Sequence, residues 1–290
     1  MRIAVTGATG QLGTDVVARL RDRGHQVLGL GSADMDITDI DSVRSVLTAF
    51  SPDAVIHCAA WTAVDAAEEP ENREKVFAVN AAGTENIARV CRELDSRMLY
   101  ISTDYVFSGE GTEPWRPQCR DFAPLNVYGE SKLRGEQAVT GLLEKYFIVR
   151  IAWVFGLHGK NFVRTMLNVA QKHDTVRVVN DQIGTPTFTE DLAVLLADMI
   201  VTDRYGIYHA TNEGGYISWY DFTCEIYRQA GLAVKVLPVT TAEYGLSLAR
   251  RPFNSRLDKS DLPARGFTPL PDWRDALSRY LLQLSENHRE

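Results

Sequence analysis

The stretch Met1-Arg-Ile-Ala-Val-Thr6, followed by Gly7-Ala-Thr-Gly10-Gln-Leu-Gly13, decides the fold. The first six residues are mostly apolar and β-branched, which predicts a buried strand. After the three glycines, apolar residues recur at helical spacing over residues 15–23, and Gly24 is expected to end that helix. Residues 25–30 predict the next strand, so the order is strand, glycine turn, helix, strand.

This order is the context in which a glycine-rich turn binds a dinucleotide. Glycines let backbone N–H groups approach a pyrophosphate, which then lies at the positive end of the helix. The spacing here is G-x-x-G-x-x-G rather than the commoner G-x-G-x-x-G. The alternative is a tight turn without a ligand.

A second motif lies near the middle of the chain, where Ser102-Thr-Asp-Tyr-Val-Phe107 precedes Tyr128-Gly-Glu-Ser-Lys132. A tyrosine and a lysine four positions apart share one face of a helix. An ammonium beside a phenol favours the phenolate and lowers the phenol's pKa, so we expect Lys132 to lower the pKa of Tyr128. The hydroxyl of Thr103 could bridge the phenol and a carbonyl substrate. The spacing alone is weak evidence, and its meaning comes from the glycine turn upstream.

Strand and helix patterns alternate through the first half, with strands expected at 54–60, 98–102 and 147–153 and mostly one long helix at 71–94. Repeated βα units predict an α/β fold with a doubly wound parallel sheet of the Rossmann type. We expect residues 1–150 to form the dinucleotide-binding domain, completed by part of 188–213, where 206–211 predicts a strand that returns to the sheet. Residues 151–187 and 214–290 are expected to form a smaller, discontinuous substrate lobe. Within it we expect helices at 160–172 and from Ser218, a strand at 176–179, and an irregular basic segment at 249–256.

Composition excludes several classes of protein. The formal charge of −7 argues against a nucleic-acid-binding protein. No apolar run approaches the ~20 residues that span a bilayer, and strand-forming sequence begins at residue 2, so we expect no signal peptide. The four cysteines form no metal-binding spacing and indicate reduced thiols, so we expect a cytoplasmic protein.

With its two motifs in this order, the chain resembles the extended short-chain dehydrogenase/reductase superfamily, and in detail the dTDP-4-dehydrorhamnose reductases. The likeness covers almost the whole chain. Its segments, besides the glycine turn, are Ala60-Trp-Thr-Ala-Val-Asp-Ala-Ala-Glu68, Val79-Asn80, Ser102-Thr-Asp-Tyr-Val-Phe107, Pro124-Leu-Asn-Val-Tyr-Gly-Glu-Ser-Lys132, Asp181-Gln-Ile-Gly-Thr-Pro-Thr187 and Arg251-Pro-Phe-Asn-Ser255.

Related dehydratases have Asp-Glu after the threonine, whereas Tyr105 follows Asp104 here, and the epimerase pattern has a serine in place of Thr103. The resemblance therefore implies reduction of the C4 ketone of dTDP-4-dehydro-L-rhamnose to dTDP-L-rhamnose, with hydride from a nicotinamide and the proton from Tyr128. Two alternatives stay open. One is a reductase of another nucleotide-linked 4-keto-6-deoxy sugar, and the other is a non-catalytic regulatory subunit that resembles the methionine adenosyltransferase beta subunit.

The resemblance also assigns roles to residues. The catalytic group is Thr103, Tyr128 and Lys132, and the substrate contacts are Thr103, Asp104, Tyr128, Trp153 and Arg251. Trp153 would stack on the sugar and Arg251 would bind the diphosphate, for which a guanidinium is well suited. Asp36 and Ile37 would lie against the adenine. The full set expected to bind the cofactor is Gly7, Thr9, Gly10, Gln11, Leu12, Gly13, Asp36, Ile37, Ala59, Ala60, Trp61, Asn80, Tyr128 and Lys132.

The cofactor is expected to be NADPH, with tolerance of NADH. An acid at the end of the second strand would bind the ribose 2′-hydroxyl of NAD, but no acid occurs there before Asp34. Some members of the family are described as dimers bridged by Mg²⁺, for which Asp15 and Glu190 are the candidate ligands. Two isolated acids are weak evidence, so we assign no metal-binding residue. The expected partners are a nucleotide sugar and, in a homodimer, a second copy of the chain, but neither a nucleic acid nor a membrane.

Overall fold

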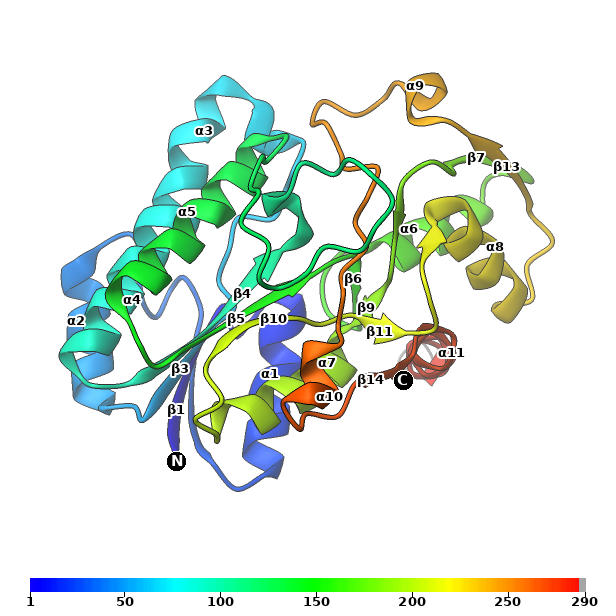
Figure 1. Cartoon of the computed structure of the whole chain (residues 1–290). Helices are drawn as coiled ribbons and strands as arrows, with labels where there is room; N and C mark the ends of the chain where they lie inside the picture. Colours follow the sequence, from blue (N-terminus) through cyan, green and yellow to red (C-terminus); the bar gives the residue numbers. More distant parts are fainter. Residues whose placement is uncertain (287–290) are drawn as a thin grey trace.

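A computed structural model describes residues 1–286 of the chain. Its centre is a six-stranded parallel sheet in the order β10-β5-β4-β3-β1-β2 (Figure 1). Strand order reverses at β1, which has β2 on one side and β3 on the other, and ligands bind beyond the carboxyl ends of strands at such a point. The strands are β1 (Arg2–Thr6), β2 (Gln26–Leu30), β3 (Ala54–His57), β4 (Arg97–Thr103), β5 (Tyr146–Ile151) and β10 (Gly206–His209).

Helices cover both faces of this sheet, because successive side chains of each buried strand point to opposite faces. Ile3 and Val5 pack against α1 (Gln11–Asp22) and α7 (Thr189–Ile200). Ala4 lies in the other core, which contains side chains from α2 (Ile40–Phe50), α4 (Thr84–Glu93) and α5 (Val127–Leu142). The predicted doubly wound α/β fold is therefore confirmed.

The long helix expected at 71–94 is also confirmed, with one difference at its centre. It consists of α3 (Pro70–Phe77), the π-helical segment η2 (Ala78–Gly83) and α4. A π-helical turn inserts an extra residue and often occurs at a functional site. Here it carries the buried side chain of Asn80.

The carboxyl ends of two strands come earlier than expected. The strand predicted at 54–60 ends at His57, and the one predicted at 147–153 ends at Ile151. In both cases the apolar run continues into a loop at the edge of the sheet. Two 3₁₀ turns lie in the loops that follow β3 and β4, namely η1 (Ala66–Glu68) and η3 (Asp104–Val106).

A C-terminal lobe of helices and short strand pairs lies at one end of the molecule (Figure 1). Aromatic side chains dominate its core, among them Phe155, Phe188, Phe222, Trp273 and Tyr280. Its helices are α6 (Phe162–Ala170), α8 (Trp219–Gln229), α9 (Thr241–Tyr244) and α11 (Trp273–Glu286), while the short helix α10 (Asp261–Ala264) contributes Leu262 to the core of the central sheet. The strand pairs are β6 (Val154–Phe155) with β9 (Thr187–Phe188), β7 (Thr175–Val179) with β13 (Lys235–Val239), β8 (Ile183–Gly184) with β12 (Ile217–Ser218), and β11 (Asn212–Glu213) with β14 (Leu270–Asp272).

Several local predictions in this half are confirmed. Gly206–His209 pairs with β5 and so returns to the central sheet, and Ser218 caps α8 through a capping box with Asp221. Residues 249–256 contain no helix or strand. The predicted substrate lobe extends to residue 290, and its last four residues lie outside those described.

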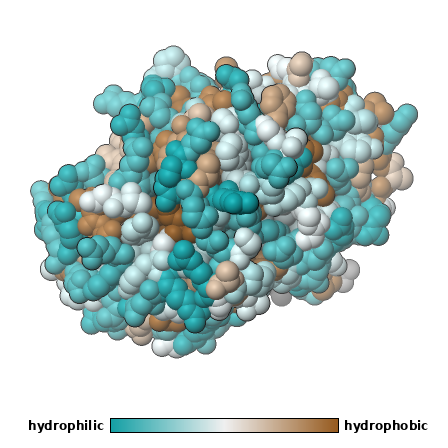
Figure 2. Space-filling model, in the orientation of Figure 1, coloured by the Kyte–Doolittle hydropathy of each residue, from teal (hydrophilic) through white to brown (hydrophobic). Residues whose placement is uncertain are grey.

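Figure 2 shows hydrophilic residues over most of the face seen there. Within residues 1–286, no helix is both long and apolar enough to cross a membrane.

Candidate active site

The glycine turn brings the start of α1 close to both β1 and the loop after β3. Gly7 has a φ of +65°, and a Cβ there would lie 2.7 Å from the backbone nitrogen of Ala59. A Cβ on Gly13 would lie 2.0 Å from the carbonyl oxygen of Gly7. Both positions therefore require glycine, the first for its conformation and its space and the second for its space alone.

The N-terminus of α1 has backbone donors without side-chain partners. Gly10 is the N-cap and provides no side-chain hydrogen bond, and the first turn has no acidic residue. Free N–H groups and the positive end of a helix form an anion site, which fits the pyrophosphate of a dinucleotide. Thr9 and Gly10 are exposed at this end, and Leu12 is buried in the core. The Gln11 side chain accepts a hydrogen bond from Asn161 at 3.1 Å.

Asp36 and Ile37, expected against the adenine, lie in the loop after β2. The Asp36 carboxylate accepts hydrogen bonds from the backbone and hydroxyl of Thr38, which lower its pKa. Ile37 packs so closely on η2 that a Cβ on Gly83 would lie 2.8 Å from it. This loop is thus fixed to the long helix.

Asn80 connects the loop after β3 to the helix that carries Tyr128. Its amide oxygen accepts from the backbone of Trp61 at 2.8 Å, and its amide nitrogen donates to the Trp61 carbonyl and to the Ser131 hydroxyl. The same loop contains Ala59 and Ala60, which are half-buried. The expected cofactor loop and the Tyr128 helix are therefore held together by one buried side chain.

Tyr128 occupies the first turn of α5, whose N-cap is Asn126. The Thr103 hydroxyl interacts with the Tyr128 phenol and acts to lower the phenol's pKa, and this hydroxyl donates to the Asp104 carboxylate at 3.0 Å. The start of α5 lies so close to η3 that a Cβ on Gly129 would be 2.3 Å from the Tyr105 carbonyl oxygen. The structure thus joins three predicted residues into the chain Tyr128–Thr103–Asp104.

The pKa of Tyr128 is shifted in the direction opposite to the one expected. Burial raises the pKa of this phenol, the Asp104 carboxylate raises it further, and the Thr103 hydroxyl lowers it. The phenol therefore stays protonated at neutral pH. A proton donor needs this state, whereas a proton acceptor would need the phenolate.

The Lys132 side chain is buried one helical turn beyond Tyr128, with 3 % of its surface exposed. Its ammonium nitrogen lies 4.1 Å from the centre of the Tyr100 ring. Burial lowers the pKa of Lys132 to about 7, while the Glu136 carboxylate acts to raise it.

Trp153 follows β5 and has a φ of +51°, a strained conformation for a bulky residue. Its ring stacks on Trp219 of α8, with the ring centres 3.6 Å apart. Strain of this kind is frequent at functional sites. The sequence provided no signal for Trp219 as a site residue.

Arg251 lies beside a pocket of about 460 Å³ between the loop after β3 and the C-terminal lobe. Its guanidinium is bound by both oxygens of Asp65, at 3.0 and 2.7 Å. Arg250, Arg177 and Trp219 also line this pocket. Asp65 belongs to one of the matched sequence segments, but only the structure shows it as the partner of Arg251.

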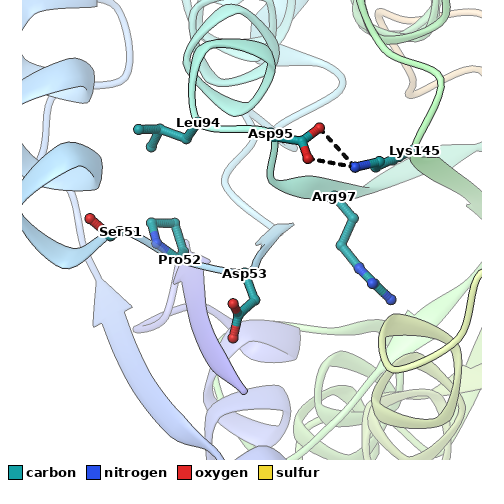
Figure 3. A pocket seen from close by; sticks show the side chains of 7 residues that line it. All are labelled: Ser51, Pro52, Asp53, Leu94, Asp95, Arg97 and Lys145. Atoms are coloured by element: carbon teal, nitrogen blue, oxygen red, sulfur yellow. Dashed lines mark hydrogen bonds and ion pairs between the residues drawn. The ribbon is translucent and has the colours of Figure 1, made fainter.

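Another pocket lies at the opposite edge of the sheet, where β3 and β4 begin (Figure 3). It measures about 440 Å³ and includes the ion pair between Lys145 and Asp95. Because ligands of parallel sheets bind at the carboxyl ends of the strands, we assign this pocket no role in the reaction.

The metal site considered from Asp15 and Glu190 has no support in the structure. Within residues 1–286, no group of three or more His, Cys, Asp or Glu side chains is arranged to hold a metal ion. Asp15 lies 3.8 Å from His158, and Glu190 is 3.9 Å from Arg279. The Arg279 guanidinium competes with a metal for the Glu190 carboxylate.

The model of the RmlD substrate binding domain family matches residues 1–286. The dTDP-4-dehydrorhamnose reductase of Streptomyces griseus is 43 % identical over 96 % of this chain and 92 % of its own. The chain belongs to the dTDP-4-dehydrorhamnose reductase family. The predicted family and class of enzyme are thus confirmed, and the protein is an oxidoreductase.

Two further relatives bear on cofactor and substrate. The crystal structure of the Bacillus anthracis dTDP-4-dehydrorhamnose reductase in complex with NADP has a TM-score of 0.92 and 39 % identity, covering 97 % of this chain and 99 % of that one. The dTDP-4-keto-6-deoxy-D-glucose reductase of Streptomyces niveus is 39 % identical over 96 % of each chain.

Proposed function

We propose that this protein reduces the C4 ketone of dTDP-4-dehydro-L-rhamnose to dTDP-L-rhamnose, with NADPH as hydride donor and Tyr128 as proton donor. The connected side chains of Tyr128, Thr103 and Asp104 at the end of β4 carry this proposal. Membership of the reductase family supports the reaction, and the free N-terminus of α1 supports a dinucleotide cofactor.

The roles of the side chains follow from their contacts. NADPH, when bound, supplies the hydride. Tyr128 gives its proton to the oxygen of the reduced ketone, and Thr103 orients the phenol and the ketone. Lys132, one turn along α5, would hold the ribose hydroxyls of the cofactor through its ammonium.

NADPH rather than NADH is supported by two observations. The solved Bacillus anthracis relative contains NADP. At the end of β2, the Asp34 side chain accepts a hydrogen bond from the backbone of Gly31 at 2.8 Å, so it is already engaged in the turn. Comparison of kcat/KM for NADPH and NADH tests this preference, and a clear advantage for NADH would contradict it.

Lys132→Ala is expected to weaken NADPH binding and to lower turnover together. The variant removes the ammonium assigned to the ribose, and the expected loss of cofactor affinity is about 10-fold or more, because a hydrogen bond to a charged group contributes ~1.5–3 kcal/mol. Fluorescence titration with NADPH and steady-state kinetics provide the two readouts. Unchanged values for both would remove the role assigned to Lys132.

Asp104 is proposed to accept a hydrogen bond from a sugar hydroxyl. Its carboxylate is buried, and no donor among the described residues meets hydrogen-bond geometry at Oδ2, although the nearby Ser255 hydroxyl, like that of Thr103, acts to lower the pKa of this carboxyl. Burial raises the pKa of Asp104 to about 6, so the carboxylate is mostly ionised at neutral pH.

The expected result for Asp104→Asn is an increase in KM for the keto sugar of about 10-fold or more, since a lost charged hydrogen bond costs ~1.5–3 kcal/mol. NADPH affinity should be unchanged, because this residue faces the sugar. If KM for the keto sugar stays normal, Asp104 does not contact the substrate.

The nucleotide end of the substrate is proposed to occupy the pocket beside Arg251, with the diphosphate on this guanidinium and the sugar against Trp153. The arginines that line the pocket favour a diphosphate, and the strained Trp153 supports an aromatic contact with the sugar. If dTDP alone fails to compete with the sugar nucleotide, this placement is wrong.

A second candidate substrate is another dTDP-linked 4-keto-6-deoxy sugar, because the Streptomyces niveus relative is named for such a reductase. A third reading is a regulatory subunit without catalysis, against which the assembled Tyr128, Thr103 and Lys132 argue. NADPH absorbance followed with freshly made dTDP-4-dehydro-L-rhamnose, and then with other keto sugars, separates these functions. A homodimer remains a proposal, for which sedimentation equilibrium is the test.

A further inference from the structure

The ammonium of Lys132 is buried without an ion-pair partner. No carboxylate among residues 1–286 lies within 4.0 Å of its nitrogen, although 97 % of the residue's surface is covered. The nearby Glu136 carboxylate accepts hydrogen bonds from Nε and Nη2 of Arg150 instead, at 2.8 and 2.7 Å. An unpaired buried charge is costly, and burial accordingly lowers the pKa of Lys132, so any group that contacts the ammonium bears on its charge.

The aromatic ring of Tyr100 is the group in contact with this charge. The nitrogen of Lys132 lies 4.1 Å from the ring centre, well inside the ~6 Å range of a cation–π contact. Tyr100 is fully buried in β4, three residues before Thr103. Burial raises the pKa of Tyr100, so its ring is the neutral phenol.

Tyr100 contacts Lys132 at a second point and is itself fixed on two sides. Its hydroxyl donates to the Lys132 backbone carbonyl at 3.3 Å. A Cβ on Gly135 would lie 2.3 Å from this hydroxyl, so a side chain there would displace the ring. His57 of β3 stacks on the ring with the centres 5.7 Å apart and is held by hydroxyls of Thr6 and Thr84.

The titratable groups around the Lys132 ammonium do not replace the Tyr100 ring as its contact. Charge interactions with Lys132 involve Glu136 on the same helix, and Cys58 and His57 from β3 and the loop after it. Burial raises the pKa of the Cys58 thiol to about 12 and lowers that of His57 to about 3, so both are neutral near pH 7.

We propose that Tyr100 is a positioning residue whose π face holds the Lys132 ammonium charged and in place for the cofactor ribose. The proposal rests on the function proposed above for the ribose contact, but the state of Lys132 can be measured without any substrate. It assigns a role to a residue at the base of the site, where the sequence shows only a strand that ends at Ser102 and Thr103.

The experiment lowers the electron density of the aromatic ring in steps while the size of the ring stays nearly the same. Position 100 is replaced by phenylalanine, 4-fluorophenylalanine and 3,4,5-trifluorophenylalanine in the full chain labelled with ¹³C-lysine, and the Lys132 signal is assigned with Lys132→Met. Tyr100→Phe is the matched control, because it removes the hydroxyl and keeps the ring. NMR titration reports the ionisation of Lys132, and fluorescence titration reports NADPH affinity.

The expected result is a graded series. From phenylalanine to trifluorophenylalanine, the acid ionisation constant of Lys132 should rise about 10-fold and NADPH affinity should fall about 3- to 10-fold, since a desolvated cation–π contact contributes up to ~2 kcal/mol. The sign follows because the ring stabilises only the charged form. Equal ionisation constants across the series would overturn the proposal. A graded ionisation constant with unchanged NADPH affinity would overturn only the link to the ribose.

Discussion

Replacing Tyr128 with phenylalanine is expected to lower turnover by about 100- to 10,000-fold, the range that general acid–base catalysis contributes. The variant keeps the ring but loses the O–H that donates to the reduced ketone. The pKa of Tyr128 is raised by burial and by Asp104, so the wild-type phenol carries its proton at neutral pH. Single-turnover oxidation of bound NADPH, followed after mixing with dTDP-4-dehydro-L-rhamnose, measures the chemical step directly.

The control for this variant is NADPH affinity, which should stay within a few-fold of the wild-type value. Near-normal turnover in Tyr128→Phe would reject the proton-donor role. Parallel loss of turnover and NADPH binding would mean that the tyrosine acts through the cofactor instead. The Asp104→Asn variant is a second comparison, since it leaves the phenol in place and removes the carboxylate that raises the phenol's pKa.

The sequence predicts two parts of this site, the glycine turn and the Tyr128–Lys132 pair, because each depends on local rules. A strand followed by glycines at positions 7, 10 and 13 predicts the turn, and close approaches of 2.7 and 2.0 Å at Gly7 and Gly13 explain why glycine is required. The four-residue spacing of Tyr128 and Lys132 places both on α5, as expected. Fold class follows from the alternation of strands and helices, which needs no long-range information.

What the sequence could not predict depends on contacts between distant segments. Asp65 and Arg251 are 186 positions apart, and neither shows from its neighbours that they form an ion pair. The lowered pKa expected for Tyr128 was wrong because the ammonium of Lys132 contacts Tyr100, while burial and Asp104 act on the phenol. Spacing along a helix fixes which residues share a face, but burial and neighbours from other elements fix their charges.

A buried ion pair beneath the site illustrates the same dependence and leads to the largest stability effect that we expect. Arg150 of β5 is fully buried, and its guanidinium binds both oxygens of Glu136 on α5, at 2.8 and 2.7 Å. Ser102, next to Thr103, also donates to Glu136, and the guanidinium lies over the ring of Phe107. This pair therefore attaches the Tyr128 helix to the strands that end at the site.

Arg150→Met is expected to lower the free energy of unfolding by about 3–5 kcal/mol, because it leaves the Glu136 carboxylate buried without its partner. Urea denaturation followed by circular dichroism measures the change. In the double variant Glu136→Met/Arg150→Met no charge is left unpaired, so much of the loss should be recovered, since apolar replacement of a buried pair is often neutral. The single variant Glu136→Met completes the comparison. If the losses of unfolding free energy in Arg150→Met and Glu136→Met simply add in the double variant, within ~0.5 kcal/mol, the two side chains are not coupled and the pair does not hold α5 on the sheet.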